Sequence, residues 1–384
     1  MKLSIKRAEF LKLLSYASQV IPSKSAEIQF MNFLINVQSD SISIIASNGD
    51  ISVKSTQTLK DSKGNEVILS AEEGAFQIQA KLLLECVSKM SGDIVSLIMV
   101  DSNLLNLSDG ISEFNLVTAA SEEYPNVDVY IDESLTSFKT NISNLKKLFD
   151  TTNFAAALKN SDPKYTGISV IAKDGKLSFS ATDSFRLARM TCDIEDKDVD
   201  CNFIVTVKAL DLVIKSVENS DVTIYANKSK VIFVSDNCLV SSSLLPGEFP
   251  TFDKLIFCTY SIFAEVDTAK FIAAAERVKI IANLDNDKPN VRLTLDKEKD
   301  SVLLSARYEN YGNSNEKISN CILTFNNNLN FFEININIDN VINSVKALNS
   351  EKFNFCFNSD VSPFMVSNDD SNNIQILTPI RRVS

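Results

Sequence analysis

The sequence predicts an α+β protein built from three copies of one unit, each with two helices and several short strands. Three observations favour this fold: a helical segment recurs along the chain, a second helical segment follows each first one, and strand-like hairpin stretches lie between them. The chain has 384 residues, against roughly 150 per domain, and 45% of them are hydrophobic. Two or three domains with large cores are therefore expected.

Each unit begins with a short strand-like stretch that runs into an amphipathic helix. Phe10, Leu145 and Phe271 anchor these first helices at separations of 135 and 126 residues. The second helix of each unit also follows a strand-like stretch, in which apolar and polar residues alternate. The first helices are expected over residues 4–18, 141–158 and 267–282, and the second helices over 79–91, 206–218 and 338–349.

Hairpins and linkers complete the expected units. Asp174-Gly175 supplies a two-residue turn between strands in 168–181, and Asn48-Gly49 lies between two similar stretches. Glu123-Tyr-Pro-Asn-Val-Asp128 and Glu248-Phe-Pro-Thr-Phe-Asp253 each end a strand with proline and begin a linker. We expect domains at 1–128, 129–258 and 259–384. Three unrelated α+β domains that share these features by chance remain an alternative.

Charge is distributed unevenly along the chain. Of the net charge of −11, the six expected helices carry +5 and the remaining residues −16. Mildly basic helices gathered on one side would contact phosphates. Lysines on the solvent-exposed face of an amphipathic helix are ordinary, however, so a purely solvated face remains an alternative.

Composition excludes most familiar enzymes. Without histidine, the Ser-His-Asp and Cys-His triads and the His-Glu-x-x-His zinc site are unavailable. The glycines form no dinucleotide or Walker phosphate loop, so we expect no cofactor. The seven cysteines contain no Cys-x-x-Cys pair and are expected to be buried free thiols, with no metal site.

No stretch approaches the roughly 18 apolar residues that cross a bilayer, and the start of the chain scatters charge where a signal peptide would be apolar. We expect a cytoplasmic protein with no membrane contact.

Three segments resemble one known family. Ala181-Thr-Asp-Ser-Phe-Arg-Leu-Ala188, Leu244-Leu-Pro-Gly-Glu-Phe-Pro-Thr-Phe-Asp253 and Ile376-Leu-Thr-Pro-Ile-Arg381 are similar to segments of the bacterial DNA polymerase III β subunits, the sliding clamps. Their order and spacing and the total length fit the family over essentially the whole chain.

The resemblance implies a ring. Two chains, each with three topologically similar DNA-clamp domains, would join head to tail as a homodimer, with helices lining the bore and sheets outside. Such a ring would encircle double-stranded DNA without reading its sequence and would confer processivity on the replicative polymerase. It needs no catalytic step, so the protein is expected not to be an enzyme.

The family's partner pocket receives short peptides from the polymerase III α subunit, the clamp loader and other proteins with a clamp-binding motif. By resemblance, this chain would bind them through Thr182, Ser184, Phe185, Arg186, Leu187, Pro250, Lys254, Leu255, Ile376, Leu377, Thr378, Pro379, Ile380 and Arg381. Phe185 replaces the family's usual histidine, and Thr378 stands where the family commonly has Leu or Met. For Leu187 and Ile376, plain core packing is the alternative to lining the pocket.

The resemblance also implies DNA and subunit contacts. The DNA-binding candidates are Lys24, Lys81, Lys146, Lys147 and Lys208, although solvent exposure alone would also explain Lys146 and Lys147. Ile280 and Ile281 resemble an apolar pair that the family places against the neighbouring subunit, and core packing is the alternative for both.

Two other functions compete with a sliding clamp. An enzyme without histidine would have Asp183 beside Arg186 as its best candidate, a pair that is more often structural. A repeat-built scaffold that binds protein without encircling DNA would show no retention on circular DNA.

Overall fold

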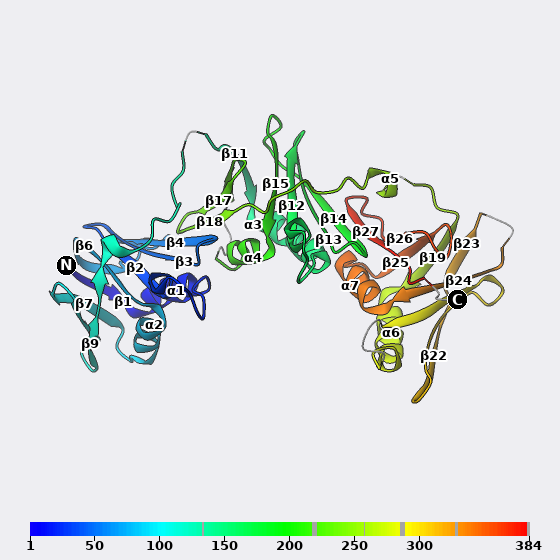
Figure 1. Cartoon of the computed structure of the whole chain (residues 1–384), viewed down its shortest axis with the longest axis horizontal. Helices are drawn as coiled ribbons and strands as arrows, with labels where there is room; N and C mark the ends of the chain where they lie inside the picture. The colour runs from blue at the N-terminus through cyan, green and yellow to red at the C-terminus, as the bar shows by residue number, and fades with distance from the viewer. Residues whose placement is uncertain (133, 217–220, 257, 285–288, 327–328, 382–384) are drawn as a thin grey trace. The chain divides into compact units, whose positions relative to one another are not determined.

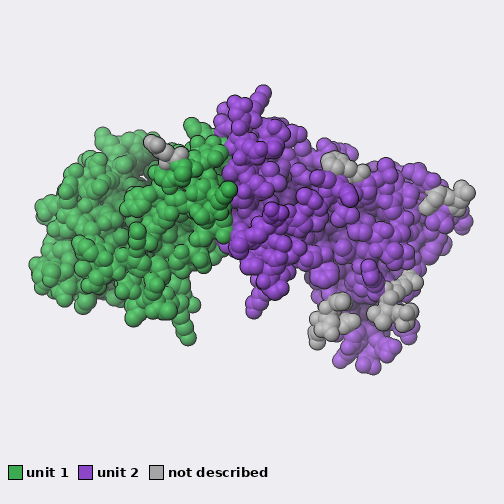
Figure 2. Space-filling view, turned by 45° about the horizontal axis from the view of Figure 1, so that its top comes forward, with its two compact units in different colours: residues 1–143, 208–244 green, residues 144–207, 245–384 purple. Residues whose placement is uncertain are grey.

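The computed structural model describes residues 1–384 except 133, 217–220, 257, 285–288, 327–328 and 382–384. The chain divides into two compact units, residues 1–143 with 208–244 and residues 144–207 with 245–384 (Figure 2). Each unit contains one nine-stranded sheet and one smaller sheet, all antiparallel.

All six expected helices are confirmed, each directly after a strand as the pattern predicts (Figure 1). The side chain of the residue just before the helix caps several of them: Asp267, before α6, accepts a hydrogen bond from the Lys270 amide (2.9 Å). The short α5 was not expected. The helices are α1 Arg7–Ser18, α2 Ala80–Lys89, α3 Ile142–Thr152, α4 Val207–Ser216, α5 Asp253–Ile256, α6 Thr268–Ala282 and α7 Ile338–Leu348.

In the described part of the chain, five short 3-10 helices connect other elements. They are η1 Ile28–Met31, η2 Ser121–Glu123, η3 Asn153–Ala155, η4 Pro163–Thr166 and η5 Lys297–Lys299. None of the helices that the structure describes has both the length and the apolar character that crossing a bilayer requires.

In the first unit, the nine-stranded sheet has the order β10-β6-β2-β3-β4-β18-β17-β16-β11. Strands β4 and β18 pair across the predicted boundary at residue 128, so one sheet continues through it. The strands are β2 Asn32–Val37, β3 Ser41–Ser47, β4 Ile51–Thr58, β6 Gly74–Gln79, β10 Ala119–Ala120, β11 Thr136–Asn141, β16 Asp221–Ala226, β17 Lys230–Ser235 and β18 Cys238–Ser243.

The five-stranded sheet of this unit has the order β5-β1-β7-β8-β9. Helices α1 and α2 contact each other, and α1 also contacts strands of both sheets. The strands are β1 Lys2–Lys6, β5 Ile68–Glu72, β7 Ile94–Asp101, β8 Leu104–Ser108 and β9 Glu113–Val117.

In the second unit, the nine-stranded sheet has the order β15-β12-β13-β14-β27-β26-β25-β19-β23. Asp174 and Gly175 make the expected two-residue turn between β12 and β13, both with positive φ (52° and 73°). The strands are β12 Gly167–Lys173, β13 Lys176–Thr182, β14 Arg186–Asp193, β15 Asp200–Thr206, β19 Ile262–Asp267, β23 Ile322–Phe325, β25 Lys352–Phe357, β26 Phe364–Ser367 and β27 Asn373–Leu377.

A four-stranded sheet of order β22-β21-β20-β24 completes this unit. Helix α6 packs on β20, β21 and β22 and on β19 of the larger sheet, while α7 lies beside α6. The strands are β20 Asn290–Asp296, β21 Ser301–Tyr308, β22 Gly312–Ser319 and β24 Phe331–Asn337.

The seven cysteines are free thiols, as expected, but not all are buried. Cys86, Cys321 and Cys356 are buried, whereas the other four are partly exposed: Cys192, Cys201, Cys238 and Cys258.

The core of the second unit is centred on phenylalanine rings. Phe355 is fully buried, and its ring centroid lies 5.0 Å from that of Phe353, 5.4 Å from Phe271 and 5.5 Å from Phe357. These rings join α6 to β25, so the helix is held against the large sheet by aromatic packing.

We predict that Phe355→Ala lowers the free energy of unfolding by about 3–5 kcal/mol, because it leaves a cavity in this cluster. Urea unfolding monitored by circular dichroism measures the change. Phe331, 54% exposed at the start of β24, provides the control. A loss in Phe331→Ala as large as in Phe355→Ala would contradict the assignment of the core.

Candidate functional site

A cavity of about 240 Å³ lies in the second unit, beside the turn between β13 and β14. Apolar and aromatic side chains make most of its lining, which also has four hydroxyl groups and one guanidinium group. The lining residues are Tyr165, Thr182, Ser184, Phe185, Arg186, Leu187, Pro250, Phe252, Leu255, Pro363, Ile376 and Thr378.

The pairing of β14 with β27 brings the two main parts of this cavity together. Leu187 pairs with Ile376 in the antiparallel ladder, and Arg186 pairs with Leu377. Leu187 and Ile376 are 4% and 3% exposed, so both belong to the core and also line the cavity.

Asp183 holds the turn that precedes β14. Its Oδ1 accepts hydrogen bonds from the backbone amides of Phe185 (2.9 Å) and Arg186 (3.0 Å). Thr182 Oγ1 donates to the Arg186 carbonyl (2.6 Å) and accepts from the Ser184 amide (3.1 Å). Ser184 has a φ of +77°, which is uncommon for a residue other than glycine, and these bonds hold it there.

The Arg186 side chain is fixed from two sides. Its Nε donates to Asp183 Oδ2 (2.9 Å), and its guanidinium carbon lies 5.4 Å from the centre of the Phe154 ring. Both side chains of the ion pair are largely buried, at 15% and 19% exposure. Asp183 therefore organises the turn and orients Arg186, which fits the structural interpretation of this pair.

Thr378 connects the segment after β27 to the same turn. Its backbone amide donates to the Phe185 carbonyl (2.8 Å), and its Oγ1 donates to the same oxygen (3.1 Å). The hydroxyl group that replaces a larger apolar side chain thus has a bonding partner. Phe185 itself is 65% exposed, so its ring stands at the rim of the cavity.

Residues 250–255, which lead into and form part of α5, make another wall of the cavity. The backbone amide of Leu255 donates to the Phe252 carbonyl (2.9 Å), and the Phe252 ring meets Phe249 edge to face at 5.9 Å. Arg189 Nη1 on β14 lies 3.9 Å from Asp253 Oδ1, which links this helix to the strand. Pro250 and Leu255 therefore reach the cavity from a segment anchored to β14.

This chemistry suits binding more than catalysis. Buried apolar side chains offer an anchoring surface, and the hydroxyl and guanidinium groups can pair with a ligand's polar atoms. Among the described residues, no group of three or more Cys, Asp or Glu side chains is arranged to hold a metal ion.

Five of the expected pocket residues do not line the cavity. Leu377 lies in the core at 2% exposure, because neighbouring residues of a strand face opposite sides. Lys254 is exposed on α5, and the Ile380 amide donates to the Asn335 carbonyl (2.9 Å) on β24. Pro379 and Arg381 flank Ile380.

Three lining residues were not predicted. Tyr165 lies on η4, Phe252 just before α5 and Pro363 just before β26. Phe252 stands within one of the quoted motifs, so its aromatic character was a usable signal. Tyr165 and Pro363 lie outside all three motifs, and only the fold brings them near.

The five lysine candidates are all exposed. Lys81 lies on α2, Lys208 on α4, Lys146 and Lys147 on α3, and Lys24 after α1. Lys147 Nζ lies 3.5 Å from Asp370 Oδ2, so part of its charge is already neutralised.

The two isoleucines near the end of α6 differ. Ile280 is 68% exposed, whereas Ile281 packs against the core of the second unit. Ile280 is thus an exposed apolar side chain of α6.

We predict that Asp183→Ala lowers the free energy of unfolding by about 1–3 kcal/mol, because two amides and the Arg186 Nε lose their acceptor. Urea unfolding measures the difference against Asp193→Ala, which removes an exposed carboxylate at the far end of β14, the strand that follows the turn. Equal effects of the two substitutions would show that the turn does not depend on Asp183.

Comparison with known proteins assigns the whole chain to one set of relatives. The sequence models of the N-terminal, central and C-terminal domains of the DNA polymerase III beta subunit match residues 1–128, 139–251 and 256–381. The "Beta sliding clamp" of Streptococcus pneumoniae serotype 4 is 27% identical over 385 residues, covering 98% of each chain.

Solved structures agree with this assignment. The beta chain of DNA polymerase III from Streptococcus pneumoniae has a TM-score of 0.91 and 26% identity, covering 99% of this chain and 100% of the other. The DNA polymerase sliding clamp of Bacillus subtilis has a TM-score of 0.92 at 23% identity, covering 100% of this chain and 99% of the other, and so shows the shared fold.

Proposed function

Because the chain belongs to the DNA polymerase III beta subunit family, we propose that it is a sliding clamp, a non-catalytic processivity factor of the replicative polymerase. The family models together cover most of the chain, and relatives named beta sliding clamp match it along nearly their whole length. The absence of histidine and the structural role of Asp183 agree with a protein that binds and does not catalyse.

The cavity between β14, β27 and α5 is the proposed binding site for partner peptides, and it is the observation that carries the proposal. Its floor is apolar at Leu187 and Ile376, and Arg186 is held in place at its edge. Burying one leucine- or phenylalanine-sized side chain of a peptide there is worth about 1.5–3 kcal/mol, which suits a ligand that binds and exchanges. The DNA polymerase III α subunit, the clamp loader and other proteins with a clamp-binding motif are the proposed partners.

The exposed aromatic ring of Phe185 adds apolar area beside the guanidinium group of Arg186. Lys254, Leu377, Pro379, Ile380 and Arg381 do not line the cavity, so their proposed role is to support the segments that do.

The proposed assembly is a head-to-tail homodimeric ring of domains 1–128, 129–258 and 259–384, working in the cytoplasm. Ile280 supplies exposed apolar surface for the contact between subunits, and Ile281 supports it from the core.

We propose that the ring encircles double-stranded DNA. Lys24, Lys81, Lys146, Lys147 and Lys208 are exposed and would attract phosphates without reading bases. Topological linkage would supply retention, so weak electrostatic contacts suffice and allow sliding.

We predict that Leu187→Ala weakens binding of a clamp-binding peptide from the polymerase α subunit at least tenfold, because it removes apolar contact from the cavity floor. Fluorescence anisotropy with a labelled peptide measures the affinity. Leu158→Ala, which removes a fully exposed leucine of the same unit, is the control and should bind normally. Unchanged affinity in a folded Leu187→Ala protein would place the peptide elsewhere.

We predict that the solution mass is near twice 42.5 kDa and that Ile280→Asp shifts it toward the monomer, because a charge at an apolar contact is costly. Light scattering measures the mass, with Val361→Asp, another exposed apolar position, as the control. Wild-type protein loaded onto circular DNA should stay bound until the circle is linearised. A monomeric wild type without such retention would instead support a protein-binding scaffold.

A further inference from the structure

The four-stranded sheet of the second unit has one face turned away from its core. On β20, Val291 and Leu293 are fully buried, while Asn290 and Arg292 on the opposite face are exposed. On β21, Leu304 is buried and Arg307 is exposed. The alternation thus places polar and cationic side chains together on the outer face.

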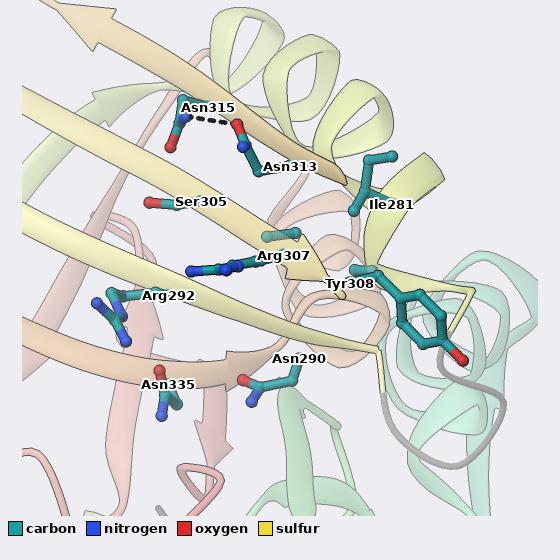
Figure 3. A pocket seen from close by; sticks show the side chains of 11 residues that line it. Ile281, Asn290, Arg292, Ser305, Arg307, Tyr308, Asn313, Asn315 and Asn335 are labelled. Atoms are coloured by element: carbon teal, nitrogen blue, oxygen red, sulfur yellow. Dashed lines mark hydrogen bonds between the residues drawn. The ribbon is translucent and has the colours of Figure 1, made fainter. Parts of the chain in front are cut away.

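A cavity of about 520 Å³ lies at one end of this sheet, separate from the proposed peptide pocket. Figure 3 shows the guanidinium groups of Arg292 and Arg307 pointing to the same side, between the amides of Asn315 and Asn335. The other lining residues are Ile281, Ala282, Asn290, Ser305, Ala306, Tyr308 and Asn313.

The charge of this cavity is opposite to that of the chain. The protein carries a net charge of −11, yet the lining residues include two arginines and no carboxylate. Arg292 Nε lies 3.1 Å from Glu333 Oε1, and the Arg292 side chain is still 54% exposed. Arg307 makes no ion pair with any residue that the structure describes.

The nearest acidic residue of β22 faces away. Glu316 pairs in register with the buried Leu304, which places it on the helix-covered face of the sheet. There both of its carboxylate oxygens accept from Arg277 of α6 (3.0 and 2.7 Å). Among the described residues, Arg307 is therefore left for an external anion, while Arg292 would share its guanidinium group between Glu333 and that anion.

The register of the strands sets the spacing of the two arginines. Arg292 pairs with Ser305, and Arg307 lies two residues further along the same face of β21. Such diagonal neighbours are about 7–8 Å apart. In an extended peptide, residues i and i+2 share one face and lie about 6.6–6.8 Å apart, so two carboxylates in the pattern acid-x-acid match this spacing.

We propose that this cavity binds an extended acidic segment of a partner protein, with two carboxylates at i and i+2 paired to Arg292 and Arg307. Guanidinium groups bind carboxylates through paired hydrogen bonds. The asparagine side chains both donate and accept, so they can bond the backbone of such a segment.

A peptide fits this cavity better than a nucleic acid does. Tyr308 is the single aromatic side chain of the lining, so the cavity has no platform on which successive bases could stack. A long polyanion would also meet the acidic remainder of the chain, whereas a short segment confines its charge to the cavity.

The test is fluorescence anisotropy on the full chain with the labelled peptide fluorescein-Ser-Glu-Val-Glu-Val-Ser-amide. Wild type should bind this peptide at least tenfold more tightly than the same peptide with Gln in place of both Glu residues. It should also prefer it to a peptide with two residues between the acids. Arg292→Gln and Arg307→Gln should each weaken binding about tenfold. Each substitution removes one charge-assisted hydrogen-bond contact, and the loss of such a contact changes the dissociation constant by about a factor of ten.

Lys317→Gln is the matched control. Lys317 lies opposite Leu303 on the same outer face but outside the cavity, so this variant loses the same charge from the same sheet. It should bind within about twofold of wild type. Unchanged urea midpoints in all three variants would show that they are folded.

Four results would overturn the proposal. The wild type could fail to bind the acidic peptide at millimolar concentration, or Lys317→Gln could lose as much affinity as Arg307→Gln, which would indicate unspecific attraction. An oligothymidylate that binds more tightly than the peptide and loses affinity in the arginine variants would make the cavity a nucleic-acid site. A dimer that dissociates in Arg307→Gln while the peptide fails to bind would make the occupant a second copy of the chain.

Discussion

The antiparallel ladder between β14 and β27 is the constraint on which the proposed peptide pocket depends. It joins Arg186 to Leu377 and Leu187 to Ile376, across almost half of the chain. Backbone hydrogen bonds set this register, so Leu187 and Ile376 meet in one position only, and the Thr378 amide then reaches the Phe185 carbonyl. A shift of one residue would turn Ile376 away from the cavity and bring Leu377 to it.

Much of the fold could be predicted from sequence because its signals are local. The six long helices have apolar residues at helical spacing, and the Asp174-Gly175 turn has the residue types that its positive φ angles demand. The four-residue α5 has too few turns to show a period. The pairing of β4 with β18 and of β14 with β27 depends on residues far apart, and no local pattern contains it.

For the candidate site, the sequence predicts which segments contribute but not which side chains of those segments line the cavity. A sequence motif consists of consecutive residues, whereas successive side chains of a strand face opposite sides of the sheet. Ile376 and Thr378 therefore line the cavity, while Leu377 lies in the core. The same limit applies on α6, where Ile280 is exposed and Ile281 packs inward. Arg292 and Arg307 gave no signal at all, because their proximity follows from the register between β20 and β21.

The ladder between β14 and β27 also has a consequence during synthesis on the ribosome. When β14 leaves the exit tunnel, roughly 180 residues must still be translated before β27 appears, which takes about 10–35 s at bacterial rates of synthesis. Throughout that interval one edge of β14 lacks its final partner, and Leu187 lacks Ile376. A nascent chain therefore has no complete cavity, and under the proposed function it would not compete with finished molecules for their peptide partners.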